Sequence, residues 1–300
     1  MSRKEVEMAH LEYRRPQNVS GDFYVDTSCI DCDTCRWMAP SVFIEDGEQS
    51  AVYHQPEDEA ERKMALQALL ACPTGSIGTI EKPRDIKEAQ LSFPILVEDN
   101  VYYCGYHSEN SYGAASYLIN LPEGNILVDS PRFTPPLVKR LEELGGIRYM
   151  YLTHRDDVAD HKKFAEHFKC ERILHKDDIT SGTKDVEIQL TGTEPVELAP
   201  DMPDILIIPV PGHSKGHTVL LYKNKFLFTG DHLAWSEENH QLVAFRDFCW
   251  YSYSEQIKSM RKLAEYTFEW VLPGHGRRFH ARAKTMASEM QKCLTWMEAP

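Results

Sequence analysis

The strongest constraint on the fold of this chain is a group of cysteines near its start. Three of them lie in the run Cys29-Ile-Asp-Cys32-Asp-Thr-Cys35, and Cys72 is followed directly by Pro73. Three thiolates on one short loop can bind three irons of a cubane, and a distant fourth thiolate completes the ligand set. The chain must therefore fold so that Cys72 returns to the loop that carries the other three cysteines.

The residues between Cys35 and Cys72 contain elements for that return. Residues 42–53 place apolar runs around an Asp-Gly turn, which predicts a hairpin, and residues 57–70 have helical periodicity. A structural zinc site is the alternative. Four-cysteine zinc sites usually show two C-x2-C pairs about 15 to 20 residues apart, and the three-cysteine run does not fit that spacing.

This segment resembles the bacterial-type ferredoxins. The shared residues are Val25-Asp26 before the cysteine run, Ala39-Pro40 after it, and residues 71–77, which read Ala-Cys-Pro-Thr-Gly-Ser-Ile. In two-cluster members of that family the fourth cysteine of each run binds the other cluster, which requires eight clustered cysteines. Only four of the eight cysteines of this chain are clustered. The resemblance therefore implies one 4Fe-4S cluster, bound by Cys29, Cys32, Cys35 and Cys72.

Charge and histidine content divide the chain into two regions. Of a net charge of −13, residues 1–99 carry −9, from 19 acidic and 10 basic residues, and the remaining residues carry −4. Eleven of the 13 histidines follow residue 100. We expect a cluster domain with its linker over residues 1–94 and a second domain over residues 95–300. The acidic surface suits a basic redox partner and does not suit nucleic acid.

The sequence has no feature that directs it to a membrane. Its apolar runs are far shorter than the roughly 18 residues of a membrane span. Residues 1–10 mix charges of both signs without an apolar block, unlike a secretory or transit peptide. We expect a cytoplasmic protein with no membrane partner.

After residue 115, short apolar runs alternate with helical patterns. Helices are predicted to begin after Thr134, which precedes two prolines, and at Ser252, which has Glu255 three residues later. Continuous apolar runs of this kind are typical of strands buried on both faces, so we expect sheets covered by helices. The predicted strands are 115–119, 126–128, 149–152, 205–208, 219–222 and 226–228.

Histidine and aspartate residues follow four of the apolar runs. Residues 154–161 read His-Arg-Asp-Asp-Val-Ala-Asp-His, residues 211–217 read Pro-Gly-His-Ser-Lys-Gly-His, and Asp231 and His275 follow two further runs. Four strand ends that present these side chains at one rim predict a metal pocket with several ligands.

This set resembles the metallo-β-lactamase superfamily, over residues 102–297. The resemblance implies an α/β (α+β) chain, in which an αβ/βα metallo-β-lactamase sandwich with a dinuclear site follows a small ferredoxin-like α+β domain. It implies that His213 binds the first metal and that Asp231 bridges both. It further implies that Asp160, His161 and His275 bind the second.

Two further residues match positions that orient ligands in that superfamily. His217 and Asp129 are expected to hold ligands in place rather than to bind metal. From the resemblance, the residues expected to act in catalysis are Asp160, Asp231 and His217.

The first motif departs from the superfamily pattern His-x-His-x-Asp-His. It begins at His154, expected to be a ligand, is two residues longer than the pattern, and has Asp156 where the second histidine belongs. Either Asp156 or Asp157 replaces the missing imidazole, or one metal position is weak or empty. Flavodiiron proteins, a redox branch of the superfamily, also have a carboxylate in that place, and a carboxylate-rich ligand set suits iron better than zinc.

The two predicted metal centres allow functions of different classes. In the first, the cluster passes electrons to a diiron site that acts on a small-molecule substrate. In the second, two zinc ions hydrolyse an ester, thioester, lactam or phosphoester, and the cluster is structural or senses redox state. A non-catalytic electron-transfer module is a lesser alternative. The aromatic residues of segment 245–253 belong either to a substrate pocket or to the edge of a core.

Overall fold

The computed structural model describes residues 9–299 and divides into two compact units. The N-terminal unit extends to Leu118 and includes residues 131–146, and the C-terminal unit comprises residues 119–130 and those from Ile147 onward. These units are defined by packing, and the domain boundary near residue 95 stays a prediction. No helix in residues 9–299 has the length and apolarity needed to cross a membrane.

The N-terminal unit is built from short strands and helices around the cysteines. Strand β1 pairs antiparallel with β4, and β2 pairs with β3 as the hairpin predicted around the Asp-Gly turn. Apolar side chains of α2 pack on these strands, and the Asp58 carboxylate accepts from the backbone N–H of Glu61 at the start of this helix. The elements up to α3 are β1 (Phe23–Val25), α1 (Thr34–Met38), β2 (Phe43–Glu45), β3 (Ser50–Val52), α2 (Glu59–Ala71), β4 (Ile77–Thr79) and α3 (Ile86–Leu91).

Residues 82–99, in which Pro83, Pro94 and several charges favour a linker, instead contain regular structure. They hold α3 and strand β5 (Ile95–Glu98), which forms an antiparallel pair with β6 (Val101–Tyr103). Strand β7 (Tyr117–Ile119) follows β6 in the same sheet, and helix α4 (Pro135–Glu143) completes the unit after its two prolines. The residues that follow the ferredoxin-like segment therefore extend the N-terminal unit.

The C-terminal unit contains two sheets that face each other. In the first, β8, β9, β10 and β11 are parallel neighbours; in the second the strand order is β12-β13-β14-β15-β18-β19. The Tyr151 hydroxyl and Thr218 Oγ1 lie 2.7 Å apart and link the two sheets. The elements are β8 (Ile126–Val128), β9 (Tyr149–Tyr151), α5 (His161–Phe168), β10 (Glu171–His175), β11 (Ile188–Leu190), β12 (Val196–Glu197), β13 (Ile205–Pro209), β14 (Thr218–Tyr222), β15 (Phe226–Gly230), β16 (Ala234–Ser236), β17 (Gln241–Val243), α6 (Tyr253–Leu263), β18 (Trp270–Pro273), β19 (Phe279–His280) and α7 (Ala283–Glu298).

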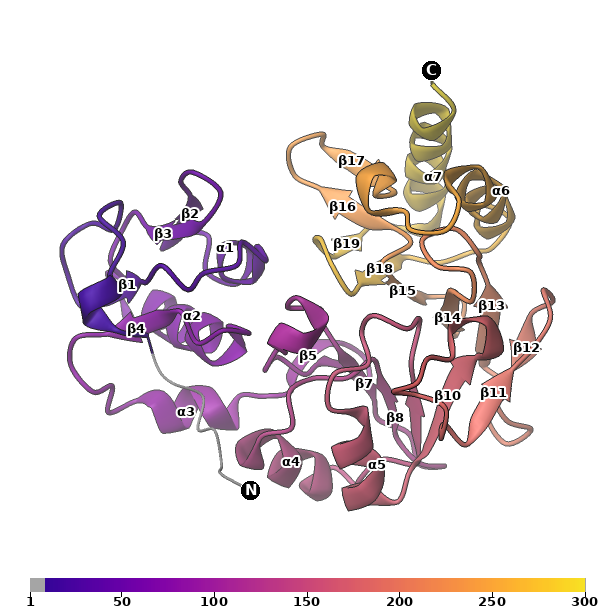
Figure 1. Cartoon of the computed structure of the whole chain (residues 1–300), viewed down its shortest axis with the longest axis horizontal. Helices are drawn as coiled ribbons and strands as arrows, with labels where there is room; N and C mark the ends of the chain where they lie inside the picture. Colours follow the sequence, from indigo (N-terminus) through magenta and orange to yellow (C-terminus); the bar gives the residue numbers. More distant parts are fainter. Residues whose placement is uncertain (1–8, 300) are drawn as a thin grey trace. The chain divides into compact units, whose positions relative to one another are not determined.

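Helices cover the second sheet on its outer face. Alternate residues of its strands, such as Val219, Leu221 and Leu227, pack against Met260 of α6 and Met290 of α7. Figure 1 shows α6 and α7 side by side against this sheet, with the β16–β17 hairpin next to α7. The predicted mixed α/β architecture of sheets covered by helices is confirmed.

This topology places several strand ends at one edge. Strands β8 and β9 are parallel, and so are β15 and β18, while β13 and β15 run the same way because each is antiparallel to β14. The residues that follow β9, β13, β15 and β18 are the ones expected to bind metal.

Candidate functional site

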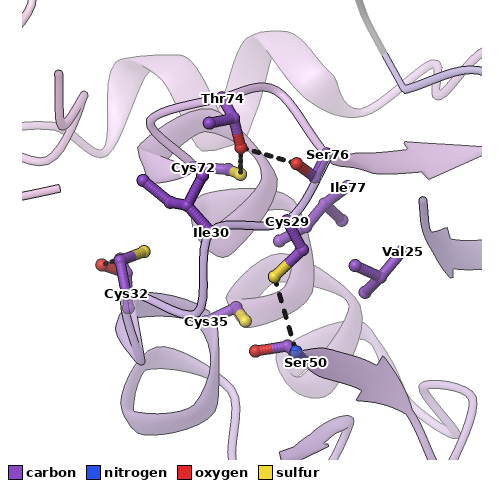
Figure 2. Close-up of a pocket in the computed structure, with 11 residues that line it drawn as sticks. Val25, Cys29, Ile30, Cys32, Cys35, Ser50, Cys72, Thr74, Ser76 and Ile77 are labelled. Carbon is purple, nitrogen blue, oxygen red and sulfur yellow. Dashed lines mark hydrogen bonds between the residues drawn. The ribbon is translucent and has the colours of Figure 1, made fainter. Parts of the chain in front are cut away.

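The first candidate site is a pocket that the four clustered cysteines share. Figure 2 shows Cys29, Cys32, Cys35 and Cys72 around this pocket, which side chains of β1, β3 and β4 complete. Cys29 and Cys32 lie on the loop before α1, Cys35 lies in α1, and Cys72 is the residue that ends α2. The fold therefore brings Cys72 back to the loop, as the sequence requires.

The cysteine loop is tight because aspartates hold it in shape. Asp31 and Asp33 both have a φ of 61°, a left-handed conformation that aspartate tolerates better than most residues. The Arg36 guanidinium donates to both carboxylates, over 2.5 and 2.7 Å. The loop thus turns sharply twice within five residues, and its three thiols face the same pocket.

The chemistry of the pocket suits an iron–sulfur cluster. Burial, with a further contribution from the Cys72 thiol, raises the pKa of Cys32 to about 12. Burial also raises the pKa of Cys35 well above its usual value. Such thiols lose their protons only to a strongly bound cation, and four converging sulfurs are the ligand set of a 4Fe-4S cluster.

Residues beyond the ferredoxin-like segment contact this pocket. The Tyr112 hydroxyl donates to the carbonyl of Ile30 over 2.7 Å, and a Cβ added to Gly113 would lie 2.8 Å from the Cβ of Cys32. The backbone N–H of His107 donates to the carbonyl of Ala71 over 3.1 Å. Residues 107–113 therefore cover part of the cysteine pocket.

The second candidate site is a group of histidines and aspartates in the C-terminal unit. One set of potential ligands comprises His154, Asp156 and His213, and another comprises His154, Asp157 and Asp231; in each set the ligand atoms lie within 4.8 Å of one another. These residues follow β9, β13 and β15. The structure thus brings together donors from loops that are far apart in sequence.

Asp231 lies at the centre of this group. Its Oδ2 is 3.6 Å from Nε2 of His154 and 3.8 Å from Nε2 of His213, and its Oδ1 is 2.8 Å from Nδ1 of His275. Asp156 Oδ2 lies 3.5 Å from His213 Nε2. This central position is the one expected for a carboxylate that bridges two metals.

The group fits metal ions because most of its polar atoms, those of the exposed Asp156 excepted, are buried and incompletely paired. Among the residues described, His154 Nε2, His213 Nε2 and both carboxylate oxygens of Asp157 are buried and make no hydrogen bond. A Cβ on Gly274 would lie 2.5 Å from Asp157 Oδ2, so only glycine leaves that space open. Buried polar groups without partners are costly, and metal ions would satisfy these atoms.

The electrostatics of the group also point to bound cations. Burial alone would lower the pKa of His154, but the carboxylates of Asp157 and Asp231 raise it to about 10. Burial and the charge of Asp231 raise the pKa of Asp157 well above its usual value. The carboxylates therefore require nearby positive charge, which protons supply here and metal ions can replace.

The structure does not bring Asp160 and His161 into this group. Asp160 precedes α5 and its carboxylate lies 2.7 Å from Nζ of Lys163, while His161 begins α5 and its Nδ1 lies 3.2 Å from the Arg172 guanidinium. Burial and Arg172 lower the pKa of His161 to about 4. The two extra residues of the first motif place Asp157 at the site, with Asp160 and His161 at the start of the helix.

The residues expected to orient ligands lie beside the group. His217 Nε2 accepts a hydrogen bond from the backbone N–H of Asp231 over 3.2 Å. Asp129 accepts from the backbone N–H of Thr153 over 2.8 Å, and Thr153 Oγ1 lies 3.0 Å from His154 Nδ1. His217 therefore contacts the backbone of the candidate ligand Asp231, and Asp129 contacts Thr153, the neighbour of the candidate ligand His154.

Sequence reasoning missed Asp178, which follows β10 and is buried. Its carboxylate accepts from Ser214 Oγ (2.5 Å) and from the backbone N–H groups of Gly216 (2.7 Å) and Arg155 (3.1 Å). It therefore links the loop of His154 to the loop of His213. Its position three residues after a strand, at the end of a 3-10 helix, was the available signal, but β10 was not among the predicted strands.

Exposed aromatic side chains lie next to His213. The backbone N–H groups of Trp250 and Tyr251 both donate to the carbonyl of His213, over 2.9 and 3.1 Å. Trp250 is 58% exposed and Phe248 is 59% exposed, and their rings contact each other edge to face. This segment presents an apolar surface beside a candidate ligand.

Comparison with known proteins supports the same two parts. Residues 25–79 match the family model described as the 4Fe-4S single cluster domain of ferredoxin I. A comparison with curated protein sequences found no match. The ferredoxin-type segment expected from the cysteines is confirmed.

The remainder of the chain is similar in structure to metallo-β-lactamases. VMB-1 superposes with a TM-score of 0.53 and 20% identity over 68% of this chain and 96% of its own. The metallo-β-lactamase of Hirschia baltica superposes with a TM-score of 0.52 and 16% identity, over 69% of this chain and 97% of its own. FIM-1 from Pseudomonas aeruginosa, in its mono-zinc form, superposes with a TM-score of 0.52 and 14% identity, over 68% of this chain and 95% of its own. This protein therefore joins a ferredoxin-type 4Fe-4S segment to a metallo-β-lactamase fold.

Proposed function

We propose that this protein is a metal-dependent enzyme with a two-metal active site in its C-terminal unit. The support is the convergence of imidazole and carboxylate groups that follow four strands; all but Asp156 and His275 are buried, and several of their atoms make no hydrogen bond among the residues described. Two neighbouring metal ions would polarise a substrate oxygen and supply charge to the reacting atoms. The residues that would hold them are His154, Asp156, Asp157, His213, Asp231 and His275.

We further propose that the chemistry is redox, with the 4Fe-4S segment as the electron donor to a diiron site. The observation that carries this proposal is Asp156, a carboxylate 3.5 Å from His213 Nε2 where a histidine is expected. With Asp157 and Asp231, three carboxylates accompany the imidazoles, and such a set suits iron. An iron–sulfur segment in the same chain provides for the delivery of electrons.

The surrounding residues have distinct tasks in this proposal. Asp231 would hold both metals, and His217 would fix the backbone of Asp231 by accepting from its N–H. Asp129 would hold Thr153, whose hydroxyl lies beside the ring of His154. A small-molecule substrate would lie against Trp250 and Phe248, whose apolar rings are exposed beside His213. A basic electron-transfer protein would be the external donor for the acidic cluster region.

Hydrolysis by two zinc ions is the second candidate. The observation that favours it is the fold, which is similar to that of metallo-β-lactamases, one of them in a mono-zinc form. The same residues would hold the metals, and the chain would need no electron from the cluster. Esters, thioesters, lactams and phosphoesters are the substrates to test.

Metal analysis of protein purified without oxygen or added metal separates these candidates. About four irons with an equal amount of sulfide, plus up to two further irons per chain, is the expected result. About four irons with one or two zincs would favour the hydrolase. Iron equal to sulfide and no other metal would leave a non-catalytic electron-transfer module.

A pair of variants tests the link between the two sites once a substrate is found. Cys32→Ser should abolish turnover driven by an electron donor while the second site stays loaded. Unchanged turnover in Cys32→Ser would contradict the role of the cluster as electron donor. A hydrolase would instead keep its activity in Cys32→Ser and lose it in Asp231→Asn.

A further inference from the structure

A buried chain of hydrogen bonds begins at the Cys32 side of the cysteine pocket. Thr34 Oγ1 lies 3.4 Å from Cys32 Sγ and 3.0 Å from Nδ1 of His107, and the Tyr103 hydroxyl lies 2.6 Å from Nε2 of His107. Thr34, His107 and Tyr103 are all buried. The Tyr103 hydroxyl also lies 3.5 Å from Met38 Sδ, but a thioether is a weak acceptor, so the much shorter contact with His107 takes the Tyr103 proton.

Binding of Cys32 to iron fixes the direction in which each group of the chain donates. A thiolate only accepts, so Thr34 must donate its single hydroxyl proton to the sulfur. The Thr34 oxygen then accepts from Nδ1–H of His107, which leaves Nε2 of His107 as an acceptor for the Tyr103 hydroxyl. Every member of the chain stays neutral, and every proton points toward Cys32.

Cys72 has a similar neighbour with the opposite arrangement. Thr74, also two residues after its cysteine, has Oγ1 3.7 Å from Cys72 Sγ and 2.6 Å from Ser76 Oγ, as Figure 2 shows. Ser76 Oγ lies 2.7 Å from Ser28 Oγ, and Ser28 donates to Asp26 Oδ1 over 2.5 Å.

This second chain ends at a carboxylate, and a carboxylate only accepts. The Ser28 proton is committed to Asp26, the Ser76 proton to Ser28 and the Thr74 proton to Ser76. Thr74 therefore has no proton left for Cys72. Two threonines at the same spacing from their cysteines thus differ: Thr34 donates to sulfur and Thr74 does not.

We propose that Thr34, held in its donating direction by His107 and Tyr103, raises the reduction potential of the 4Fe-4S cluster. Reduction adds one electron and one negative charge, shared with the sulfur ligands, and breaks no bond. A hydrogen-bond donor to sulfur stabilises that charge. The inference rests on the cluster that the four cysteines are proposed to bind and is independent of the metal in the second site.

His107 and Tyr103 lie outside the part of the chain that matches the ferredoxin model, residues 25–79. In this proposal the potential of the cluster is therefore set partly by residues outside the matched segment. His107 and Tyr103 act through Thr34 and are positioning residues.

Redox titration of the full-length protein tests the proposal. The cluster is reconstituted with iron and sulfide without oxygen, reduced stepwise with dithionite and followed by its paramagnetic resonance signal. We expect Thr34→Val and His107→Phe each to lower the midpoint potential by about 59 mV, a tenfold change for one electron. The double variant should shift no further, because the two residues act in series.

Matched variants separate this effect from general disturbance. Thr74→Val makes the same change beside Cys72 and should leave the potential unchanged, and Thr34→Ser keeps the hydroxyl and should restore the wild-type value. Equal potentials in Thr34→Val and Thr74→Val, or additive shifts in the double variant, would overturn the proposal.

Two further outcomes are decisive. If His107→Phe does not fold, the comparison of Thr34→Val with Thr34→Ser still tests the proposal. Valine keeps most of the shape of threonine without its hydroxyl, and serine keeps the hydroxyl. A wild-type protein that binds no cluster on reconstitution would overturn both this inference and the role proposed for the cysteines. A cluster whose potential ignores Thr34 would overturn this inference alone.

Discussion

In the cysteine pocket three of the four sulfurs come from one short segment, residues 29–35, whereas the group around Asp231 draws its donors from residues after four strands. In the cysteine pocket burial raises the pKa of a thiol, as at Cys32. The group around Asp231 instead holds imidazoles whose pKa values carboxylates raise, as at His154. The first site therefore suits a preformed cluster with soft ligands, and the second suits individual ions that exchange with protons.

The difference also concerns what holds each site together. The cysteine loop is stabilised locally, by Arg36 bound to two aspartates within five residues. The second site depends on long-range contacts such as those of Asp178, which joins loops more than 50 residues apart. Damage to one site should therefore leave the other intact.

Reciprocal loss of metal is the largest effect expected. Asp231→Asn should reduce the metal bound outside the cluster to below about a tenth of its wild-type amount, because Asp231 is the residue proposed to hold both metals. Cys72→Ser should remove the cluster iron and sulfide and leave the other metals in place. Elemental analysis of the two variants measures both effects, and loss of both metal centres in either variant would contradict their independence.

Asp178→Asn tests the long-range support of the second site. We expect metal affinity at His154, Asp156 and His213 to fall by about 10- to 100-fold, as for other residues that orient ligands. Titration of the metal-free protein with cobalt, followed by its visible absorption, measures this. The control is Asp177→Asn, since Asp177 pairs with Lys215 at the exposed surface of the same loops. Equal affinities in the two variants would exclude the linking role.

Gly113→Ala tests the cover of the cysteine pocket. Gly113 has a φ of +87°, and a Cβ added to it would lie 2.8 Å from the Cβ of Cys32. Gly192 has a similar φ of +90°, but a Cβ added to it would have no described atom within 4 Å. Both changes strain the backbone equally, so Gly113→Ala should cost about 1–3 kcal/mol more than Gly192→Ala through overpacking. Urea unfolding of the cluster-free protein compares them, and similar midpoints would show that residues 107–113 do not pack on the loop.

An ion pair in the N-terminal unit should give the smallest effect. Arg62 donates to both Asp85 oxygens, over 2.6 and 3.1 Å, and these hydrogen bonds lower the pKa of Asp85. A lowered pKa means that the pair stabilises the fold above the unfolded value of about 3.9 and loses this contribution as the pH falls through the lowered pKa.

Asp85→Asn should therefore reduce the free energy of unfolding at pH 7 by a few tenths of a kcal/mol, because both partners are a third exposed, at 34% and 37%. The difference from wild type should vanish in acid. Asp201→Asn in the C-terminal unit removes a more exposed pair with Arg148 and should cause no measurable change. A loss that persists in acid would contradict the electrostatic origin.

The local patterns were the ones that the sequence predicted well. The cysteine run, the hairpin around the Asp-Gly turn and the buried strands β13, β14 and β15 depend on neighbouring residues, and the structure has them as expected. Strand β10 begins with the charged residues Glu171 and Arg172, so periodicity did not indicate it. The apolar run of β5 lies between Pro94 and charged residues, which favoured a linker instead.

The candidate metal site could be predicted in outline, but not which residue of the first motif faces it. His154, His213, Asp231 and His275 lie together because strand direction alone brings their loops to one edge. Whether Asp157 or Asp160 faces that edge depends on how two extra residues are accommodated before α5, which no local pattern determines. Their roles as ligands stay predictions.

The cover of the cysteine pocket has a consequence for the order of synthesis. A ribosome that adds about 5–20 residues per second needs roughly 2 to 8 s to extend the chain from Cys72 to Gly113. During that interval the four sulfurs have been made, while Tyr112 and Gly113, which close over their loop, have not. A cluster inserted before Gly113 is made would meet an uncovered pocket, whereas one inserted into the finished protein would meet a pocket that Tyr112 and Gly113 partly cover.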